Sequence, residues 1–190
     1  MGQDKTLIQV SGVRLFDYVY DKCSRLFSEI IIVTNKPQQF IGYQALVVID
    51  KIPGSSSLGG IYTGLIWSSH YHAFCVACDM PFLQQELISH ILSNRFHYDV
   101  VIPVTKKGFE PLHALYSKRC IEPIKKLLKE GKYKITAFFP EIRIKYCEEE
   151  EIKKFDPSFS SFTNINTIKD LVKIQEMLRG YEWEEKLKAC

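Results

Sequence analysis

The chain has 190 residues, of which 46% are hydrophobic, and this length suits one large domain with its own core. Its 25 basic and 22 acidic residues are interspersed and give a formal net charge of +3, which excludes the strong positive field of a nucleic-acid-binding protein. No apolar segment approaches the roughly 20 residues that span a bilayer, and the N-terminus lacks a signal pattern. We therefore expect a soluble cytoplasmic protein whose partners include neither nucleic acid nor a membrane.

The apolar periodicity predicts strands that alternate with helices. Strands are predicted at 6–10, 29–35, 45–49, 74–78, 99–103, 112–116 and 143–146, and helices at 16–27, 61–69, 83–92, 120–130 and 168–178. This rhythm is typical of a doubly wound α/β sheet. We expect a single domain over residues 1–180, followed by a tail over residues 181–190.

The six cysteines are scattered through apolar segments, unlike the dense framework of a small secreted domain. Cys75 and Cys78 form a C-x-x-C, but along a strand they would point to opposite faces, and no second pair completes a zinc site. We interpret His70 and His72 as surface residues at a polar helix end. The acidic run from Glu148 to Glu151 is most simply a solvated face.

Polar residues follow the predicted strands where each strand ends. Asp79 comes directly after the apolar run 74–78, Asn35 ends the strand at 29–35, and Asp50 follows the strand at 45–49. The carboxyl edge of an open α/β sheet is where ligands bind. Taken alone, Asp79 could equally well cap the helix that begins near Leu83.

Residues 53–60 read P-G-S-S-S-L-G-G and lead into a helix, an arrangement that suits a phosphate or a base edge but is more often only a loop. The dinucleotide, P-loop and serine-hydrolase motifs are absent from the sequence. The polar residues at the strand ends and the Gly-rich loop remain as site candidates. Together with Lys5 and the pair Asn164 and Asn166, they suit a nucleotide and Mg²⁺, which prefers oxygen ligands. Lysine is a natural point charge for phosphate oxygens.

Five short motifs, in order, resemble those of the molybdenum cofactor guanylyltransferases. They are M-G-Q-D-K at residues 1–5, S-L-G-G at 57–60, C-D-M-P at 78–81, P-L-H-A-L-Y at 111–116 and F-T-N-I-N-T at 162–167. The resemblance implies a three-layer α/β/α, Rossmann-like fold of the nucleotide-diphospho-sugar transferase type, with a mostly parallel sheet. It also implies transfer of GMP from GTP to molybdopterin.

The resemblance further implies roles for individual residues. Lys5 would contact the nucleotide phosphates, and Asp79 would hold Mg²⁺ and contact GTP. The residues expected near the guanine or the ribose are Asp50, Leu58, Gly59 and Gly60, with Asn35 as a looser match. Asn164 and Asn166 would lie on the pterin side, and Asn166 also near the metal. Molybdopterin-delivering proteins and molybdoenzymes would be its protein partners.

The family signature begins upstream of Met1, with a first strand and a Gly-rich loop that this chain lacks. The resemblance therefore predicts that roughly a dozen residues precede Met1, in a mobile loop of the kind that carries function. Base selectivity depends on that loop, so cytidylyl transfer to molybdopterin and nucleotidyl transfer to a sugar phosphate stay open. A non-catalytic adaptor that handles molybdopterin is an alternative from another class.

Overall fold

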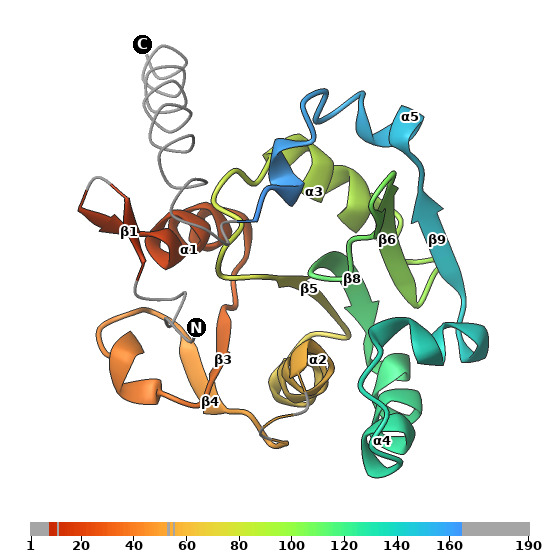
Figure 1. The fold of residues 1–190 in the computed structure, drawn as a ribbon, viewed down its shortest axis with the longest axis horizontal. Helices are drawn as coiled ribbons and strands as arrows, with labels where there is room; N and C mark the ends of the chain where they lie inside the picture. Colours follow the sequence, from red (N-terminus) through yellow and green to blue (C-terminus); the bar gives the residue numbers. More distant parts are fainter. Residues whose placement is uncertain (1–7, 11, 53, 55, 165–190) are drawn as a thin grey trace.

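The computed structural model describes residues 8–10, 12–52, 54 and 56–164 (Figure 1). Its helices are α1 Leu15–Leu26, α2 Ser56–Trp67, α3 Gln85–Ser93, α4 Ile121–Lys129 and α5 Glu149–Ile152, with short 3-10 helices η2 Pro37–Phe40, η3 Lys118–Cys120, η4 Ile135–Glu141 and η5 Ser160–Phe162. Its strands are β1 Gln9–Val10, β2 Val13–Arg14, β3 Ile31–Thr34, β4 Leu46–Ile49, β5 His72–Val76, β6 Val100–Thr105, β7 Gly108–Phe109, β8 His113–Ser117 and β9 Ile144–Cys147. None of the described helices has the length and apolarity that a membrane crossing requires.

Helices cover both faces of the main sheet, which gives three layers (Figure 1). Along β6, Val100 and Ile102 pack into a core with α2 and α4, while Val101, on the opposite face, packs against α3. This alternation follows from the two-residue period of a strand whose two faces are both buried. The predicted three-layer α/β/α architecture is confirmed.

The main strands run in one direction, with one exception. β5 and β6 both pair antiparallel with β8, so they are parallel to each other, and β9 is parallel to β6. β3 pairs in parallel with β4. Glu29, just before β3, accepts hydrogen bonds from Ser68 and Ser69, just before β5, so β3 and β5 begin at the same edge. The sheet is therefore mostly parallel, as predicted.

The sheet is interrupted between β3 and β5. β3 pairs only with β4, and β5 pairs only with β8, so among the described residues each of these two strands has one edge without a neighbouring strand. A cavity lies between the two edges. This gap explains why every residue of β5 is half-buried rather than fully buried, although the apolar run 74–78 predicts a central strand.

Candidate functional site

Asp79 follows β5 at the carboxyl edge of the sheet, as predicted. Its side chain is largely buried at 7% exposure, and the residue lines the cavity between β3 and β5. The helix that follows, α3, has Gln84 as its N-cap residue, so Asp79 does not cap it. The capping alternative is therefore excluded.

Asn35 and Asp50 lie side by side at the same edge. The register of β3 and β4 pairs Thr34 with Ile49, and these are the residues that precede them. Asn35 is exposed, whereas Asp50 is half-buried. Cys78, directly before Asp79, packs in one cluster with residues of β3 and β4, so the carboxyl ends of β3, β4 and β5 meet at one edge.

The Asp50 carboxylate is held in place by hydrogen bonds. Its Oδ1 accepts from the backbone N–H of Ile52 at 3.0 Å and from the Thr63 hydroxyl at 3.2 Å. Thr63 is fully buried in α2, and its Oγ1 also accepts from the backbone N–H of Lys51 at 3.1 Å. The sequence analysis missed Thr63, although a small hydroxyl side chain within the apolar part of this helix was a signal for such a role.

The stretch that the sequence predicted as a loop is the first turn of α2. The helix begins at Ser56, not at Ile61, so Leu58, Gly59 and Gly60 are helical. The side chain of Leu58 has 0% exposure and packs in the main core, which overrides the weak helix propensity of Ser and Gly. The Leu58 side chain is therefore part of the core in this structure. The first N–H groups of a helix have no intrahelical partner, so the backbone there can still donate.

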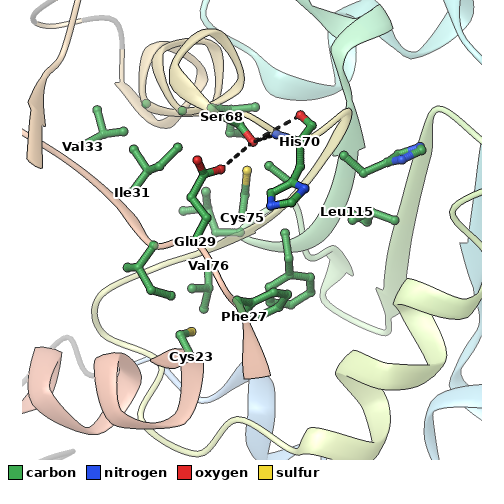
Figure 2. A pocket seen from close by; sticks show the side chains of 18 of the residues that line it. Cys23, Phe27, Glu29, Ile31, Val33, Ser68, His70, Cys75, Val76 and Leu115 are labelled. Atoms are coloured by element: carbon green, nitrogen blue, oxygen red, sulfur yellow. Dashed lines mark hydrogen bonds between the residues drawn. The ribbon is translucent and has the colours of Figure 1, made fainter. Parts of the chain in front are cut away.

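The cavity has a volume of about 990 Å³ and is lined by both strand edges and both helical layers. Ile31 and Val33 of β3 line one side, Cys75 and Val76 of β5 line the other, and Gly60 lies where α2 meets it. Figure 2 shows the opposite end, where Glu29 and Ser68 are joined by a hydrogen bond of 3.1 Å. Asp79 and Gly60 thus lie at the end of this cavity that faces the carboxyl edge of the sheet.

Two of the thiols around this cavity, those of Cys23 and Cys75, are buried. Burial raises the pKa of Cys23 and of Cys75 to about 12, so neither carries appreciable thiolate at neutral pH. The described cysteines are all free.

The structure also shows the surroundings of two histidines, His113 and His72, and of the acidic residue Glu151. His113 is fully buried, and its ring packs edge-on between those of Phe74 and Phe162. His72, expected at a helix end on the surface, lies within β5 and is half-buried, because the strand begins earlier than the apolar run indicates. Glu151, expected on a solvated face, pairs with His90 and Lys145.

Asn164 is exposed two residues after η5. Lys5 and Asn166 lie outside the described residues, as do the helix predicted at 168–178 and the tail at 181–190. The predicted site residues that the structure places at this edge offer oxygen atoms or backbone N–H groups: the carboxylates of Asp50 and Asp79, the amide of Asn35 and the start of α2. Oxygen donors fit a hard divalent cation such as Mg²⁺ rather than a soft one.

Residues 1–143 match the family described as the MobA-like NTP transferase domain. The chain is 36% identical over 180 residues to the molybdenum cofactor guanylyltransferase of Desulfosudis oleivorans, covering 94% of this chain and 89% of that protein. It is 35% identical to a probable molybdenum cofactor guanylyltransferase of Natranaerobius thermophilus, over 94% of this chain and 90% of that one.

Solved structures share the fold. The molybdopterin-guanine dinucleotide biosynthesis protein A of Archaeoglobus fulgidus superposes with a TM-score of 0.81 at 28% identity, covering 94% of this chain and 92% of that one. The 2-C-methyl-D-erythritol 4-phosphate cytidylyltransferase of Thermus thermophilus reaches a TM-score of 0.67 at 12% identity, over 92% and 94% of the two chains. The second likeness extends to the fold alone and carries no statement about a substrate.

Proposed function

Because this chain belongs to the family of MobA-like NTP transferase domains, we propose that it transfers GMP from GTP to molybdopterin and releases pyrophosphate. This activity is that of a molybdenum cofactor guanylyltransferase, a nucleotidyltransferase. The observation that carries the proposal is the position of Asp79. It is a largely buried carboxylate that lines a cavity at the edge where β3, β4 and β5 end.

The reaction forms one P–O bond and breaks another. A terminal phosphate oxygen of molybdopterin attacks the α-phosphorus of GTP, and the bond between that phosphorus and the oxygen bridging to the β-phosphate breaks. Pyrophosphate leaves with that oxygen and its electron pair. The nucleophile is already an anion, so the protein needs no strong base, and positioning and charge neutralisation supply most of the catalysis.

Asp50, Gly59 and Gly60 form the proposed guanosine side of the site. The Thr63 hydroxyl and the Ile52 N–H orient the Asp50 carboxylate, which would accept hydrogen bonds from the ribose or the base. The N–H groups at the start of α2, including those of Leu58 and Gly59, would donate to the nucleotide, because a helix N-terminus favours anions. Asn35, exposed beside Asp50, completes the nucleotide contacts.

Lys5 and Asp79 are the proposed catalytic residues. The ammonium of Lys5 would bind the phosphate oxygens, and Asn164 and Asn166 would contact the pterin. We propose Asp79 and Asn166 as ligands of Mg²⁺. The bound cation would neutralise the charge of the triphosphate and of the leaving pyrophosphate.

Asp79→Asn tests this assignment, since the amide preserves the size of the side chain and removes its charge. We expect guanylyl transfer to fall at least a hundredfold, as when one electrostatic contact to a reacting phosphate is lost. The matched control is Asp21→Asn, at an exposed position of α1, which should leave turnover unchanged. A folded Asp79→Asn variant with normal Mg²⁺-dependent turnover would overturn the assignment.

Base selectivity is tested by thermal stabilisation with GTP, CTP, ATP and UTP, each with and without Mg²⁺. Stabilisation by GTP alone supports guanylyl transfer. Preference for CTP would replace it with cytidylyl transfer, and no response to any nucleotide would support the non-catalytic adaptor.

A further inference from the structure

A second cluster of ligand-type side chains lies away from Asp79, where α3 packs against β9 and α5. His90 comes from α3, Cys147 is the last residue of β9, and Glu151 belongs to α5. One ligand atom from each residue lies within 4.8 Å of the other two. Segments far apart in the sequence thus bring a nitrogen, a sulfur and an oxygen donor to one point.

The two carboxylate oxygens of Glu151 have different partners. Oε1 lies 2.5 Å from His90 Nε2, and Oε2 accepts from Lys145 Nζ at 2.9 Å. The imidazole of His90 is also stacked on Phe155, with ring centroids 4.5 Å apart. Glu151 and His90 are therefore held in position by neighbours that would not themselves be ligands, which is how the surroundings of metal sites usually orient their ligands.

We propose that His90, Cys147 and Glu151 form a binding site for Zn²⁺, with water as the fourth ligand. Zinc accepts thiolate, imidazole and carboxylate together, whereas Mg²⁺ prefers oxygen donors alone. The set therefore selects a different ion from the one proposed at Asp79. Cys147 is fully buried, while the side chains of His90 and Glu151 are each 23% exposed and provide a path for the ion.

Binding requires a small rearrangement and the loss of a proton. Zinc–ligand distances of about 2.0 to 2.3 Å place tetrahedral ligands roughly 3.5 Å apart. The 2.5 Å contact between His90 Nε2 and Glu151 Oε1 must therefore open. Burial raises the pKa of the Cys147 thiol to about 12, so its proton passes to the buffer only when the ion binds the sulfur. Lys145 can keep its contact with Oε2 throughout.

The bound ion would fasten α3 to the segment that leads toward Asn164. The backbone N–H of Gln84, the N-cap residue of α3, already donates to the Ser161 hydroxyl at 3.1 Å. Zinc would add a bond of much greater strength between the same two parts of the chain. We therefore expect the ion to stabilise the fold without taking part in nucleotide chemistry.

Titration of the metal-free full chain with Co²⁺ tests the site through its absorption spectrum. A cysteine ligand gives a thiolate-to-cobalt charge-transfer band, which should saturate at one equivalent and disappear when Zn²⁺ is added. Cys147→Ser should remove the band, and His90→Ala should weaken Zn²⁺ binding at least tenfold. At a hundredfold excess over Kd, Zn²⁺ should raise Tm by roughly 5 °C or more.

Two matched variants keep the test decisive. Cys120→Ser removes another buried thiol and should keep the band, and Asp79→Asn should bind Zn²⁺ normally even if it cannot transfer GMP. If Cys147→Ser does not fold, Glu151→Gln takes its place, since that side chain is partly exposed, and it should weaken Zn²⁺ binding at least tenfold. A missing charge-transfer band, or one that survives Cys147→Ser, would overturn the proposal, as would normal Zn²⁺ binding by both His90→Ala and Glu151→Gln.

Discussion

The carboxylate of Glu29 accepts a hydrogen bond from the Ser68 hydroxyl at 3.1 Å and closes the amino-terminal end of the cavity between β3 and β5 (Figure 2). The backbone N–H of Ser69 donates to the same carboxylate at 3.1 Å. Burial alone would raise the pKa of Glu29, but the hydrogen bonds from Ser69 and Ser68 and the nearby His70 lower it below its usual value. The contact is thus strongest when Glu29 is ionised.

Glu29→Ala removes this link between the start of β3 and the start of β5. We expect the free energy of unfolding to fall by about 1 kcal/mol, because a half-exposed carboxylate contributes less than a buried one. The amide of Ser69 should also exchange its hydrogen faster. Denaturant titration and hydrogen exchange measure the two effects, with Glu86→Ala, an exposed acidic residue of α3, as the control. Unchanged exchange at Ser69 would contradict the prediction.

His113 makes the fold sensitive to mild acid. Burial lowers its pKa to about 3 from 6.5, and among the described residues neither ring nitrogen has a hydrogen-bond partner. Below pH 6.5 the unfolded chain takes up a proton that the folded chain refuses, so stability is lost as the pH falls from 6.5 toward 3. Between pH 7 and pH 5 the loss from this residue should be about 2 kcal/mol.

His113→Phe should remove that part of the pH dependence, because phenylalanine keeps the ring contacts with Phe74 and Phe162 and does not titrate. Urea unfolding at pH 7 and pH 5 measures the difference between wild type and variant. His97→Asn, at an exposed histidine, should leave the difference as it is in the wild type. If His113→Phe lost as much stability between pH 7 and pH 5 as the wild type, a group other than His113 would be responsible for the pH dependence.

Thr63→Val tests whether orientation of Asp50 matters for nucleotide binding. Valine fills the same buried space but cannot donate to Oδ1, so Asp50 would keep only the hydrogen bond from Ile52. We expect KM for GTP to rise about fivefold to tenfold, the equivalent of one hydrogen bond, with a smaller change in kcat. Ser24→Ala, at an exposed hydroxyl of α1, should change neither constant. If a folded Thr63→Val variant had a normal KM for GTP, the orientation of Asp50 would not matter for nucleotide binding.

Asp99 joins the start of β6 to the start of β9. Its Oδ2 accepts from the backbone N–H of Arg143 at 3.1 Å and from the Arg143 side chain at 3.3 Å. Burial alone would raise the pKa of Asp99, but the Arg143 contacts and the charge of Arg119 lower it below 3.8. The stabilisation is therefore present above pH 3.8 and is lost as the pH falls through the lowered pKa.

Asp99→Asn should lower the free energy of unfolding at pH 7 by about 1 to 2 kcal/mol, since it weakens hydrogen bonds to a charged partner. The difference in the free energy of unfolding between wild type and variant should become smaller as the pH falls through the lowered pKa of Asp99, because the carboxylate is then protonated. Chemical denaturation at neutral and at strongly acid pH measures this, and Asp21→Asn should show no effect at either pH. If the difference in the free energy of unfolding persisted after acidification, the shape of the Asp99 side chain, and not its charge, would support the fold.

The sequence predicted the position of Asp79 because a short apolar run that ends in a polar residue and a proline has few other solutions in an α/β protein. It failed at the start of α2, since Ser and Gly have weak helix propensity and only the burial of Leu58 in the core makes those residues helical. It also failed at Glu151, because a run of acidic residues carries no sign of His90, which lies about 60 positions earlier in the chain. The assigned roles of all the predicted site residues stay predictions; these residues are Lys5, Asn35, Asp50, Leu58, Gly59, Gly60, Asp79, Asn164 and Asn166.

Among the described residues, β3 and β5 each have one edge without a neighbouring strand, and we expect this part of the fold to unfold less cooperatively than a continuous sheet. β3 and β4 form a two-stranded sheet of their own, and the link described for Glu29 runs through its side chain rather than through a strand ladder. The β3–β4 pair is thus attached to the rest of the fold by helix packing and a few polar contacts. Under denaturant this pair can open as a separate unit before the sheet of β5, β6, β8 and β9 melts, so a single midpoint would describe only the last event.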